Sequence, residues 1–385
     1  MIKYYKKVEG NYMYRKTFIT VNKKLLKSNI VSILKKYDDY KYYFGVVKGN
    51  CYGHGIELIT TMKEAGINYF AVSSLDEAIE VRKIDKITPV LIFGYVSQTD
   101  CLVAKQNNLT VSIISYEQYL EIKDVKVKCH IKLNTGMNRV GIDNKEHVKE
   151  IVENMNVEGI YTHFGTDGVM DVYHDLQYNS FLELTSLIDL EKIKIVHLYN
   201  SLNLVRREKR NIANGVRLGL IMYGYTNSIK EPSGIRKTKF NIRKKLKTKF
   251  SKVSKTTLEN NLKLDKILKL ESQIIYLKKI NKQSFVGYNA SFIAKTPCFV
   301  ATLPIGTADG INKNYNQVYI NGKYYKIINY NMDYTNILVD ETIKLYDKAE
   351  IIGDNISINA IAKNNNISVH QVLVSLTDRI KRIIE

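Results

Sequence analysis

The feature that most constrains the fold is a regular alternation between about residue 41 and residue 224. Short β-branched or apolar runs alternate there with longer segments, such as 55–66 and 75–83, in which apolar residues recur at i, i+3 and i+4. The apolar runs number eight, at 42–47, 69–74, 90–95, 110–115, 127–134, 159–164, 193–200 and 216–224. Eight strand and helix units in roughly 200 residues predict a (β/α)8 barrel with parallel strands, an α/β fold of the TIM-barrel type.

The character of the chain changes after residue 226. Residues 227–262 are basic and rich in Ser and Thr, and from residue 263 onward runs such as SFVGYNASF, CFVATLPIG and NILVD are typical of antiparallel strands. We therefore expect a barrel over 20–226, a basic insertion or linker over 227–262, and a mainly antiparallel β domain over 263–385 that packs with residues 1–19. The segment 358–383 predicts one or two short helices.

The net charge of +20 comes from 58 Lys and Arg against 38 Asp and Glu. Half of this excess lies in residues 236–255, which hold ten Lys or Arg and no Asp or Glu. Elsewhere the excess is mostly Lys in a chain rich in Asn, Ile and Tyr, the composition of an AT-rich coding sequence. A basic run at a domain junction is usually a solvated loop, so we expect no specific nucleic-acid partner. Contact of 236–255 with a polyanion or an anionic membrane, aided by Phe240 and Phe250, stays an alternative.

The cysteines and the apolar segments indicate the compartment. The four cysteines, Cys51, Cys101, Cys129 and Cys298, are widely spaced without a CxxC pattern, which argues against a zinc site or a disulfide framework. No stretch approaches 18 apolar residues, and the first residues lack the apolar core of a signal peptide. We expect a soluble, cytoplasmic protein without a metal.

The predicted strand ends carry polar residues, where a barrel of this type places its chemistry. They are Lys48, Ser73, Ser115, Asn134, His163, Asn200 and Ser201. Strands also end in polar residues simply because the chain leaves the core there, and that explanation suffices for Ser73 and Ser115. It explains Lys48 less well, because Lys48 directly follows an apolar FGVV run. Desolvation lowers a lysine pKa, as imine formation with a carbonyl cofactor requires.

Two arginines and a serine extend this set. Arg139 lies in a polar loop after the fifth strand, where a fixed cation is suited to a phenolate or a carboxylate. Ser201 after the seventh strand and the backbone N–H groups of Gly219 and Leu220 after the eighth would form the phosphate site often found at that corner. Arg217 would point into the barrel mouth. Each of these residues, taken singly, also has a purely structural explanation.

Taken together and in order, the motifs resemble the bacterial alanine racemase family. They are VKGNCYGHG, KLNTGMNRVG, YTHF, HLYNS, GVRLGLIMYG, VGYNASF, LPIGTADG, NMD and SLTDRIKR, and they run from about Arg15 to Arg382 around the basic insertion. The resemblance implies a pyridoxal 5'-phosphate enzyme with a (β/α)8 barrel and a C-terminal β domain. It also implies a homodimer whose active sites each borrow residues from the partner, and a role in D-alanine supply for the cell wall.

The resemblance implies a role for each site residue. Lys48 forms an imine with the cofactor and is one catalytic base, and Tyr288 from the partner subunit is the other. Tyr52, Ser201, Gly219 and Leu220 hold the cofactor phosphate, Arg217 faces the pyridine nitrogen, Arg139 faces the phenolic oxygen, and His163, Asn200 and His370 complete the cofactor-binding set. Asn331 and Met332, with Arg139, line the site of the substrate carboxylate. Lys132 matches a position that is carbamylated in some members.

Chemistry supports these roles. Racemisation removes the Cα proton from one face and returns it on the other, so two acid/base groups must flank a planar carbanion. A tyrosine base requires cationic neighbours that favour its phenolate. An arginine facing the pyridine nitrogen does not give up its proton, which favours reprotonation of Cα over transamination or decarboxylation.

The departures from the family pattern concern the substrate. The family's inner-gate tyrosine is replaced by His370, and Thr307 and Asn329 replace a second tyrosine and an arginine. Asn134 and Asn331 stand where the family usually has aspartate and cysteine. We expect a wider and more polar pocket that accepts serine as well as alanine, and a racemase that prefers serine or another small amino acid stays an alternative.

Two further alternatives share part of the pattern. A decarboxylase of a basic amino acid with the same architecture would need a reactive cysteine beside an acidic residue, and Cys298 in KTPCFV lacks that setting. A cofactor-carrying regulatory protein without turnover would resemble the barrel alone, whereas this chain retains the β domain with Tyr288.

Overall fold

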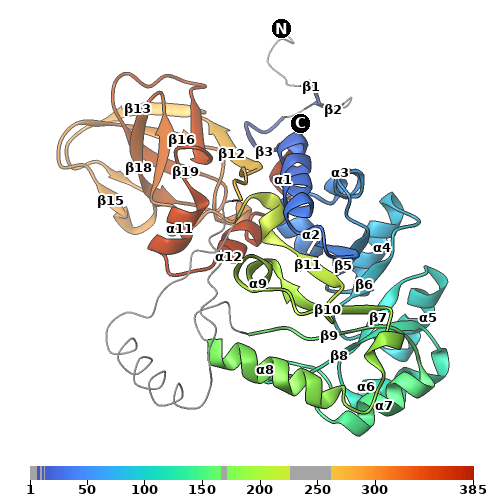
Figure 1. The fold of residues 1–385 in the computed structure, drawn as a ribbon. Helices are drawn as coiled ribbons and strands as arrows, with labels where there is room; N and C mark the ends of the chain where they lie inside the picture. Colours follow the sequence, from blue (N-terminus) through green and yellow to red (C-terminus); the bar gives the residue numbers. More distant parts are fainter. Residues whose placement is uncertain (1–6, 9–10, 13, 166–170, 226–261) are drawn as a thin grey trace. The chain divides into compact units, whose positions relative to one another are not determined.

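The computed structural model describes residues 7–8, 11–12, 14–165, 171–225 and 262–385 (Figure 1). The basic stretch 236–255 and all of the predicted linker except its last residue, 262, lie outside the described residues. The chain forms two compact units. One comprises Leu26–Gly49 and Ile59–Asp265, and the other comprises Met1–Leu25, Asn50–Leu58 and Lys266–Glu385.

The first unit contains a closed barrel of eight parallel strands, which confirms the predicted fold class (Figure 1). The strands are β4 (Tyr42–Val46), β5 (Tyr69–Val72), β6 (Val90–Ile92), β7 (Thr110–Ile113), β8 (Lys128–Lys132), β9 (Asn156–Tyr161), β10 (Ile195–Asn200) and β11 (Gly215–Leu218). They follow one another around the barrel in chain order, and β11 closes it by pairing with β4. The carboxyl ends of all eight strands therefore meet at one mouth.

Helices alternate with these strands as the 3.6-residue periodicity predicts. They are α1 (Lys23–Lys36), α2 (Lys48–Gly53), α3 (Ile59–Glu64), α4 (Leu75–Ile84), α5 (Gln98–Gln106), α6 (Tyr116–Ile122), α7 (Lys145–Asn154), α8 (Asp171–Leu184) and α9 (Ser201–Arg206). Side chains that accept backbone N–H groups begin several of them, as Ser115 does for α6 by accepting from Gln118 N–H. Within the described ranges, no helix combines the length and apolar character needed to cross a bilayer.

The eighth predicted run is only half strand. β11 ends at Leu218, and the rest of the run forms a short 3-10 helix, η4 (Leu220–Tyr223), that ends at Gly224 with a φ of 84°. All four residues of η4 are buried. The apolar run thus indicated burial correctly, but it did not distinguish an extended conformation from a helical one.

The second unit is built on a nine-stranded sheet in the order β13-β16-β19-β18-β17-β20-β12-β3-β21. Its strands are β3 (Thr17–Val21), β12 (Leu268–Gln273), β13 (Tyr276–Ile280), β16 (Cys298–Leu303), β17 (Gln317–Ile320), β18 (Lys323–Tyr330), β19 (Thr335–Val339), β20 (Lys348–Ile352) and β21 (Lys381–Ile384). All neighbours pair antiparallel except β21, which lies parallel to β3. Residues from near the two ends of the chain therefore lie on adjacent strands.

Two short helices and two pairs of short strands also belong to the second unit, and the end of the chain corrects the sequence prediction. The end of the chain forms α11 (Ile358–Asn364) and α12 (Val369–Val374) as expected, but its last residues form β21 because β3 offers a free strand edge. SFVGYNASF forms two short antiparallel strands, β14 (Phe285–Val286) and β15 (Phe292–Ile293), on either side of a turn that carries Tyr288. Near the N-terminus, β1 (Lys7–Val8) pairs with β2 (Asn11–Tyr12).

Candidate active site

Four cations gather at the barrel mouth. Lys48 follows β4, Lys132 ends β8, Arg139 lies in the loop after β8, and Arg217 is the third residue of β11. Their charges influence one another: partial desolvation first, and Arg139 second, lower the pKa of Lys48, while Glu77 opposes the shift. A concentration of positive charge at one end of a closed barrel favours an anionic ligand there.

Lys132 lies at the centre of this cluster. Its side chain is buried, and burial, followed by three neighbouring cations, lowers its pKa to about 8. Those cations are Arg139, Arg217 and Lys48. Among the residues that the structure describes, no carboxylate forms an ion pair with Lys132. A buried ammonium in this setting is poorly compensated, so the site lacks a negative charge that a ligand or a modification would supply.

The segment that follows Lys48 has an unusual backbone. Five consecutive φ angles are positive: 62° at Gly49, 52° at Asn50, 54° at Cys51, 54° at Tyr52 and 79° at Gly53. α2 is therefore a left-handed turn, which costs about 1–2 kcal/mol for each residue other than glycine. Gly53 permits a close approach as well, because a Cβ there would lie 2.4 Å from the carbonyl oxygen of Leu373. Strain of this kind concentrates at functional sites.

Three backbone carbonyls hold the Arg217 guanidinium in place. Its Nη1 donates to the His197 carbonyl over 2.5 Å, and its Nη2 donates to the Thr162 carbonyl over 2.8 Å and to the Leu198 carbonyl over 3.1 Å. Burial lowers its pKa to about 10, against a smaller opposing effect of Tyr161, so the guanidinium stays charged near neutral pH. None of its hydrogen bonds within the described chain uses Nε. That N–H is available to a ligand.

The loop that carries Arg139 is organised by Asn134. The Asn134 Oδ1 accepts the Asn138 N–H over 2.9 Å, and its Nδ2 donates to the Asn138 Oδ1 over 3.1 Å. The loop closes where Leu133 bridges to Ile142. Asparagine at this position therefore serves the loop conformation, since it can both donate and accept. Arg139 itself is exposed, and in the described part of the chain its guanidinium forms no hydrogen bond or ion pair.

Ser201 and Gly219 join the ends of β10 and β11. The Ser201 Oγ accepts the Gly219 N–H over 2.8 Å, and no side chain caps the N-terminus of η4 at Leu220. Asn200 acts as the N-cap of α9, because its Oδ1 accepts from Leu202 N–H and Asn203 N–H, each over 3.0 Å. The Ser201 hydroxyl and the uncapped N-terminus of η4 at one corner suit the oxygens of a phosphate.

His163 lies two residues beyond β9 and is half-buried. Burial, followed by the charges of the four cations, lowers its pKa to about 3. The imidazole is therefore neutral at physiological pH and does not add to the positive charge of the mouth. The predicted cofactor-binding residues of the barrel strand ends therefore all lie in one unit, at or beyond the carboxyl ends of its strands.

Tyr52 and His370 lie together in the second unit. The Tyr52 side chain is buried, and its ring centroid lies 5.5 Å from that of His370 on α12, with the planes inclined by 48°. The left-handed turn and the α12 helix therefore present an aromatic pair in which histidine stands where the family pattern has tyrosine.

Tyr288 projects from the β14–β15 hairpin and is 81% exposed. Its turn contains three positive φ angles, 81° at Gly287, 54° at Asn289 and 51° at Ala290. Beneath it lies Asn329, which is 6% exposed. Asn329 packs closely against Gly287 of the hairpin, because a Cβ at Gly287 would lie 2.2 Å from the Asn329 Oδ1. The resemblance to the family did not predict this supporting role.

Asn331 and Met332 lie in the loop between β18 and β19, where Met332 is 69% exposed. The LPIGTADG loop holds this segment through its backbone: Thr307 N–H donates to the Asn331 carbonyl over 2.9 Å, and Ala308 N–H donates to the Met332 carbonyl over 3.0 Å. Gly306 is required at this contact, because a Cβ there would lie 2.4 Å from both carbonyl oxygens.

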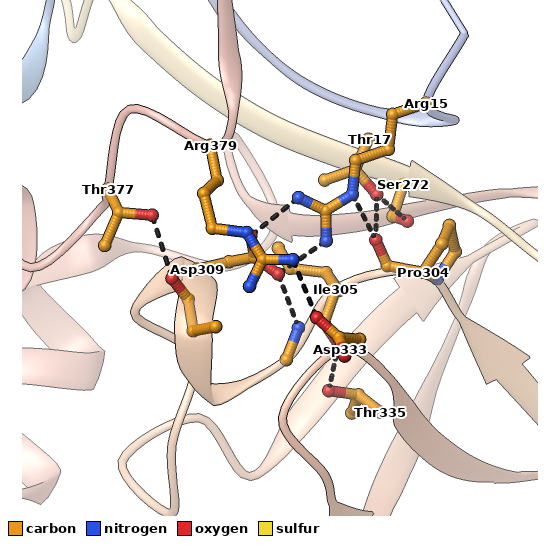
Figure 2. Close-up of polar contacts among 12 residues, drawn as sticks. Arg15, Thr17, Ser272, Pro304, Ile305, Asp309, Asp333, Thr335, Thr377 and Arg379 are labelled. Carbon is orange, nitrogen blue, oxygen red and sulfur yellow. Dashed lines mark hydrogen bonds and ion pairs between the residues drawn. The ribbon is translucent and has the colours of Figure 1, made fainter.

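An ion cluster around one buried carboxylate fixes the two loops, and the sequence prediction missed it (Figure 2). Arg15 donates to both oxygens of the fully buried Asp309, each over 2.6 Å. Arg379 lies 3.6 Å from Asp309 and donates to Asp333, next to Met332, over 2.7 Å. Arg379 and Asp309 lie in the motifs SLTDRIKR and LPIGTADG, but the motifs alone did not indicate that the two residues meet.

Comparison with known proteins shows the family. The family model described as alanine racemase, N-terminal domain, matches residues 21–227, and that described as alanine racemase, C-terminal domain, matches residues 267–384. An alanine racemase of Streptococcus pyogenes is 31% identical over 388 residues, covering 96% of this chain and 98% of the relative.

Solved structures give the same result. A crystal structure of alanine racemase from Bacillus anthracis with bound L-Ala-P has a TM-score of 0.84 and 28% identity, covering 97% of this chain and 96% of that chain. The alanine racemase from E. faecalis has a TM-score of 0.84 and 25% identity, covering 97% and 99%.

Proposed function

This chain belongs to the alanine racemase family, and we propose that it interconverts L- and D-alanine with pyridoxal 5'-phosphate as its cofactor. The observation that carries the proposal is the cluster of four cations around the buried Lys132, for which the described chain offers no carboxylate partner. A phosphate and a phenolate on one small molecule complement such a site. The family is pyridoxal 5'-phosphate dependent, and the donor groups fit that cofactor.

Each donor group has a matching acceptor on the cofactor. Arg217 would direct its free Nε–H toward the pyridine nitrogen, and Arg139 would face the phenolic oxygen. Ser201 with the backbone of Gly219 and Leu220 would hold the phosphate, and Tyr52, His163, Asn200 and His370 complete the proposed set. Lys48 would bind the carbonyl carbon, since its lowered pKa favours the neutral, nucleophilic amine. When bound, the cofactor supplies the electron sink that makes the substrate Cα proton acidic.

Two bases on opposite faces of the substrate would perform the racemisation. Lys48, once freed, holds or releases a proton on one face, and Tyr288 does so on the other. The exposure of Tyr288 supports its donation to the active site of a second subunit, as does the exposure of Met332 beside the proposed carboxylate site. We therefore propose a homodimer with shared active sites, and we place it in the cytoplasm as a source of D-alanine for peptidoglycan.

The permanent charge of Arg217 directs the outcome. Because the guanidinium keeps its protons near neutral pH, Arg217 would donate a hydrogen bond, and no proton, to the ring nitrogen of the cofactor. Return of a proton to Cα is then favoured over transamination. Decarboxylation has less support: the partner of Cys298, at the start of β16, on the neighbouring strand β13 is the apolar Ile280.

Serine is the second candidate substrate. His370 beside Tyr52 replaces a bulkier phenol ring, and the exposed Thr307 replaces another, which favours room for a hydroxymethyl group. Asn329 does not contribute to this widening, since it is buried under the Tyr288 hairpin. Serine turnover that is negligible beside alanine turnover, and unchanged in His370→Tyr, would exclude this candidate.

The decisive experiment incubates purified protein and cofactor with single L-amino acids in deuterium oxide. Deuteration at Cα together with inversion, for alanine and to a lesser degree serine, is expected. Release of carbon dioxide from lysine, ornithine or diaminopimelate would identify a decarboxylase instead. Absence of Cα exchange with every amino acid would overturn the proposed activity. Deleting 236–255 and measuring retention on lipid and on nucleic acid tests the separate alternative for that segment.

A further inference from the structure

A chain of buried polar side chains runs through the barrel behind Arg217. The Arg217 Nη1 lies 3.0 Å from the His197 Nδ1, and the His197 Nε2 lies 2.9 Å from the His130 Nδ1. Both imidazoles have no exposed surface. The His130 Nε2 in turn faces the Glu158 Oε2 at 3.6 Å, a charge contact longer than a hydrogen bond. The proposed chemistry uses neither histidine nor Glu158.

The chemistry of the donors fixes the proton positions along this chain. A guanidinium only donates, so the His197 Nδ1 must accept and its proton must lie on Nε2. That proton points at the His130 Nδ1, which must accept too, and the His130 proton then lies on Nε2. There it faces the carboxylate of Glu158. Burial, as the largest cause, lowers the pKa of both histidines, so each is neutral.

The far end of the chain is anchored at the opposite end of the barrel. Glu158 accepts from the Tyr69 hydroxyl over 2.8 Å and pairs with the partly exposed Lys194 over 2.6 Å. Burial acts to raise the pKa of Glu158, but its contacts with His130, Lys194 and Tyr69 outweigh burial and hold it far below the ordinary range. This series of buried side chains therefore runs from a fixed anion, Glu158, near the strand starts to a fixed cation, Arg217, at the barrel mouth.

Packing leaves the two rings little freedom. The His197 ring is stacked between Phe44 and Tyr161, with centroids 4.5 Å away on each side and planes inclined by 13° and 18°. The His130 ring lies against Gly159, where a Cβ would come within 2.6 Å of the His130 Cε1. Glycine at position 159 is therefore needed for the space that it leaves, since no positive φ is involved.

We propose that Glu158 and His130 are positioning residues of the reaction, which act through His197 to orient Arg217 toward the cofactor. The effect on the reaction rests on the proposed function, whereas the series of buried side chains does not depend on it. Arg217 and Glu158 favour this tautomer pattern from opposite ends, so removing the charge of Glu158 leaves only Arg217 to hold it and makes exchange of both tautomers easier. The His197 Nδ1–H would then oppose an N–H of Arg217, two donors would face each other, and the guanidinium would turn away from its present geometry.

The first test reads the tautomers directly in the cofactor-free protein. With 15N-labelled histidine at neutral pH, long-range 1H–15N correlations are expected to show two buried neutral imidazoles protonated at Nε2. His130→Asn and His197→Asn variants assign the signals. A His197 ring that is protonated at Nδ1, or charged, would overturn the proposal whatever the enzymatic activity is.

The second test uses Glu158→Gln and Gly159→Ala, which disturb the chain by charge and by volume. Matched controls are Asp85→Asn, a buried carboxylate paired with Lys63 over 3.1 Å, and Gly45→Ala, a barrel glycine that packs on Ile67 and Phe70. The readouts are the absorption spectrum of the bound cofactor, kcat and KM separately, and the rate at which cofactor is lost to transamination.

We expect three changes in Glu158→Gln and Gly159→Ala that the controls do not show. The cofactor spectrum shifts, transamination is faster, and kcat falls by about tenfold at similar KM. Variants that match their controls in spectrum and kcat, at equal folded fraction by thermal melting, would refute the positioning role. Wild-type protein that binds no pyridoxal 5'-phosphate would instead refute the proposed function, while the tautomer pattern would still decide whether the chain exists as described.

Discussion

Asn329 accepts the hydroxyl proton of Ser291 through its Oδ1 over 3.0 Å, which ties the hairpin of Tyr288 to β18. Its Nδ2 donates to Asn336 over 3.0 Å, so one buried amide connects the hairpin with two strands of the sheet. The turn of Tyr288 therefore has a defined support in spite of its exposed position.

Replacing Asn329 by alanine removes this support. We expect a several-fold fall in kcat with unchanged cofactor affinity, because the hairpin carries the proposed base and no proposed cofactor ligand. Asn355→Ala, which removes an exposed amide that donates to Glu350 over 3.1 Å, is the control. Equal kcat values in both variants would show that the hairpin is held by other contacts.

Shared active sites predict rescue between two inactive variants. Lys48→Ala and Tyr288→Phe each remove one base from every site, so each alone is expected to lose racemisation. In a hybrid dimer, one site combines the intact Lys48 of one subunit with the intact Tyr288 of the other. After subunit exchange at equal amounts, about a quarter of the wild-type activity is expected, since half of the dimers are hybrids with one good site each. No recovery would contradict the shared site.

Lys132 is expected to react with carbon dioxide. Its pKa of about 8 leaves an appreciable neutral fraction near neutrality, and the amine would form a carbamate with release of one proton, placing a negative charge among the cations. With 13C-labelled bicarbonate, a carbamate resonance is expected in wild-type protein and its absence in Lys132→Gln. Lys63, paired with Asp85, serves as a control lysine through Lys63→Gln. A signal that persists in Lys132→Gln would exclude this position.

Asp309 is expected to be essential for the loop of Met332. Removing the charge of a fully buried carboxylate leaves Arg15 and Arg379 without their shared partner, and breaking such a pair typically costs about 3–5 kcal/mol. Asp309→Asn should therefore lower the melting temperature and raise KM for the amino acid. Asp354→Asn, which removes an exposed carboxylate that pairs with Lys269, should change neither, and identical melting of the two variants would oppose this assignment.

Acid should begin to destabilise the protein at pH values well above the pKa range of ordinary carboxylates. Burial, as the first cause, lowers the pKa of five histidines: His54, His130, His163, His174 and His197. The unfolded chain therefore binds these protons first, and the free energy of unfolding falls as the pH drops below about 6.5 toward the folded-state values of about 3 to 4.

The measurement is the free energy of unfolding between pH 8 and pH 5. Its slope near pH 5 should correspond to about four to five protons taken up on unfolding. Carboxylates with lowered pKa values, such as Glu158, contribute only at lower pH, so they do not obscure this window. A slope of one proton or less would contradict the burial of these histidines as neutral groups.

Much of the architecture followed from the sequence because its signals are local. Eight apolar runs at helix-separated intervals predicted the barrel, and the position of Lys48 after FGVV placed it at the mouth, since a parallel strand must deliver its next residue there. The order and spacing of the motifs also indicated the family, and the comparisons confirm it.

Only the tertiary structure decided what depends on distant residues. The left-handed turn at Tyr52 needs the close approach of Gly53 to Leu373, and β21 forms because β3, from the other end of the chain, offers an edge. The contact of His130 with His197 joins residues 67 positions apart. Periodicity reports which residues are buried, but it does not report which buried groups meet, and the hydrogen bonds between them are set by the closed barrel.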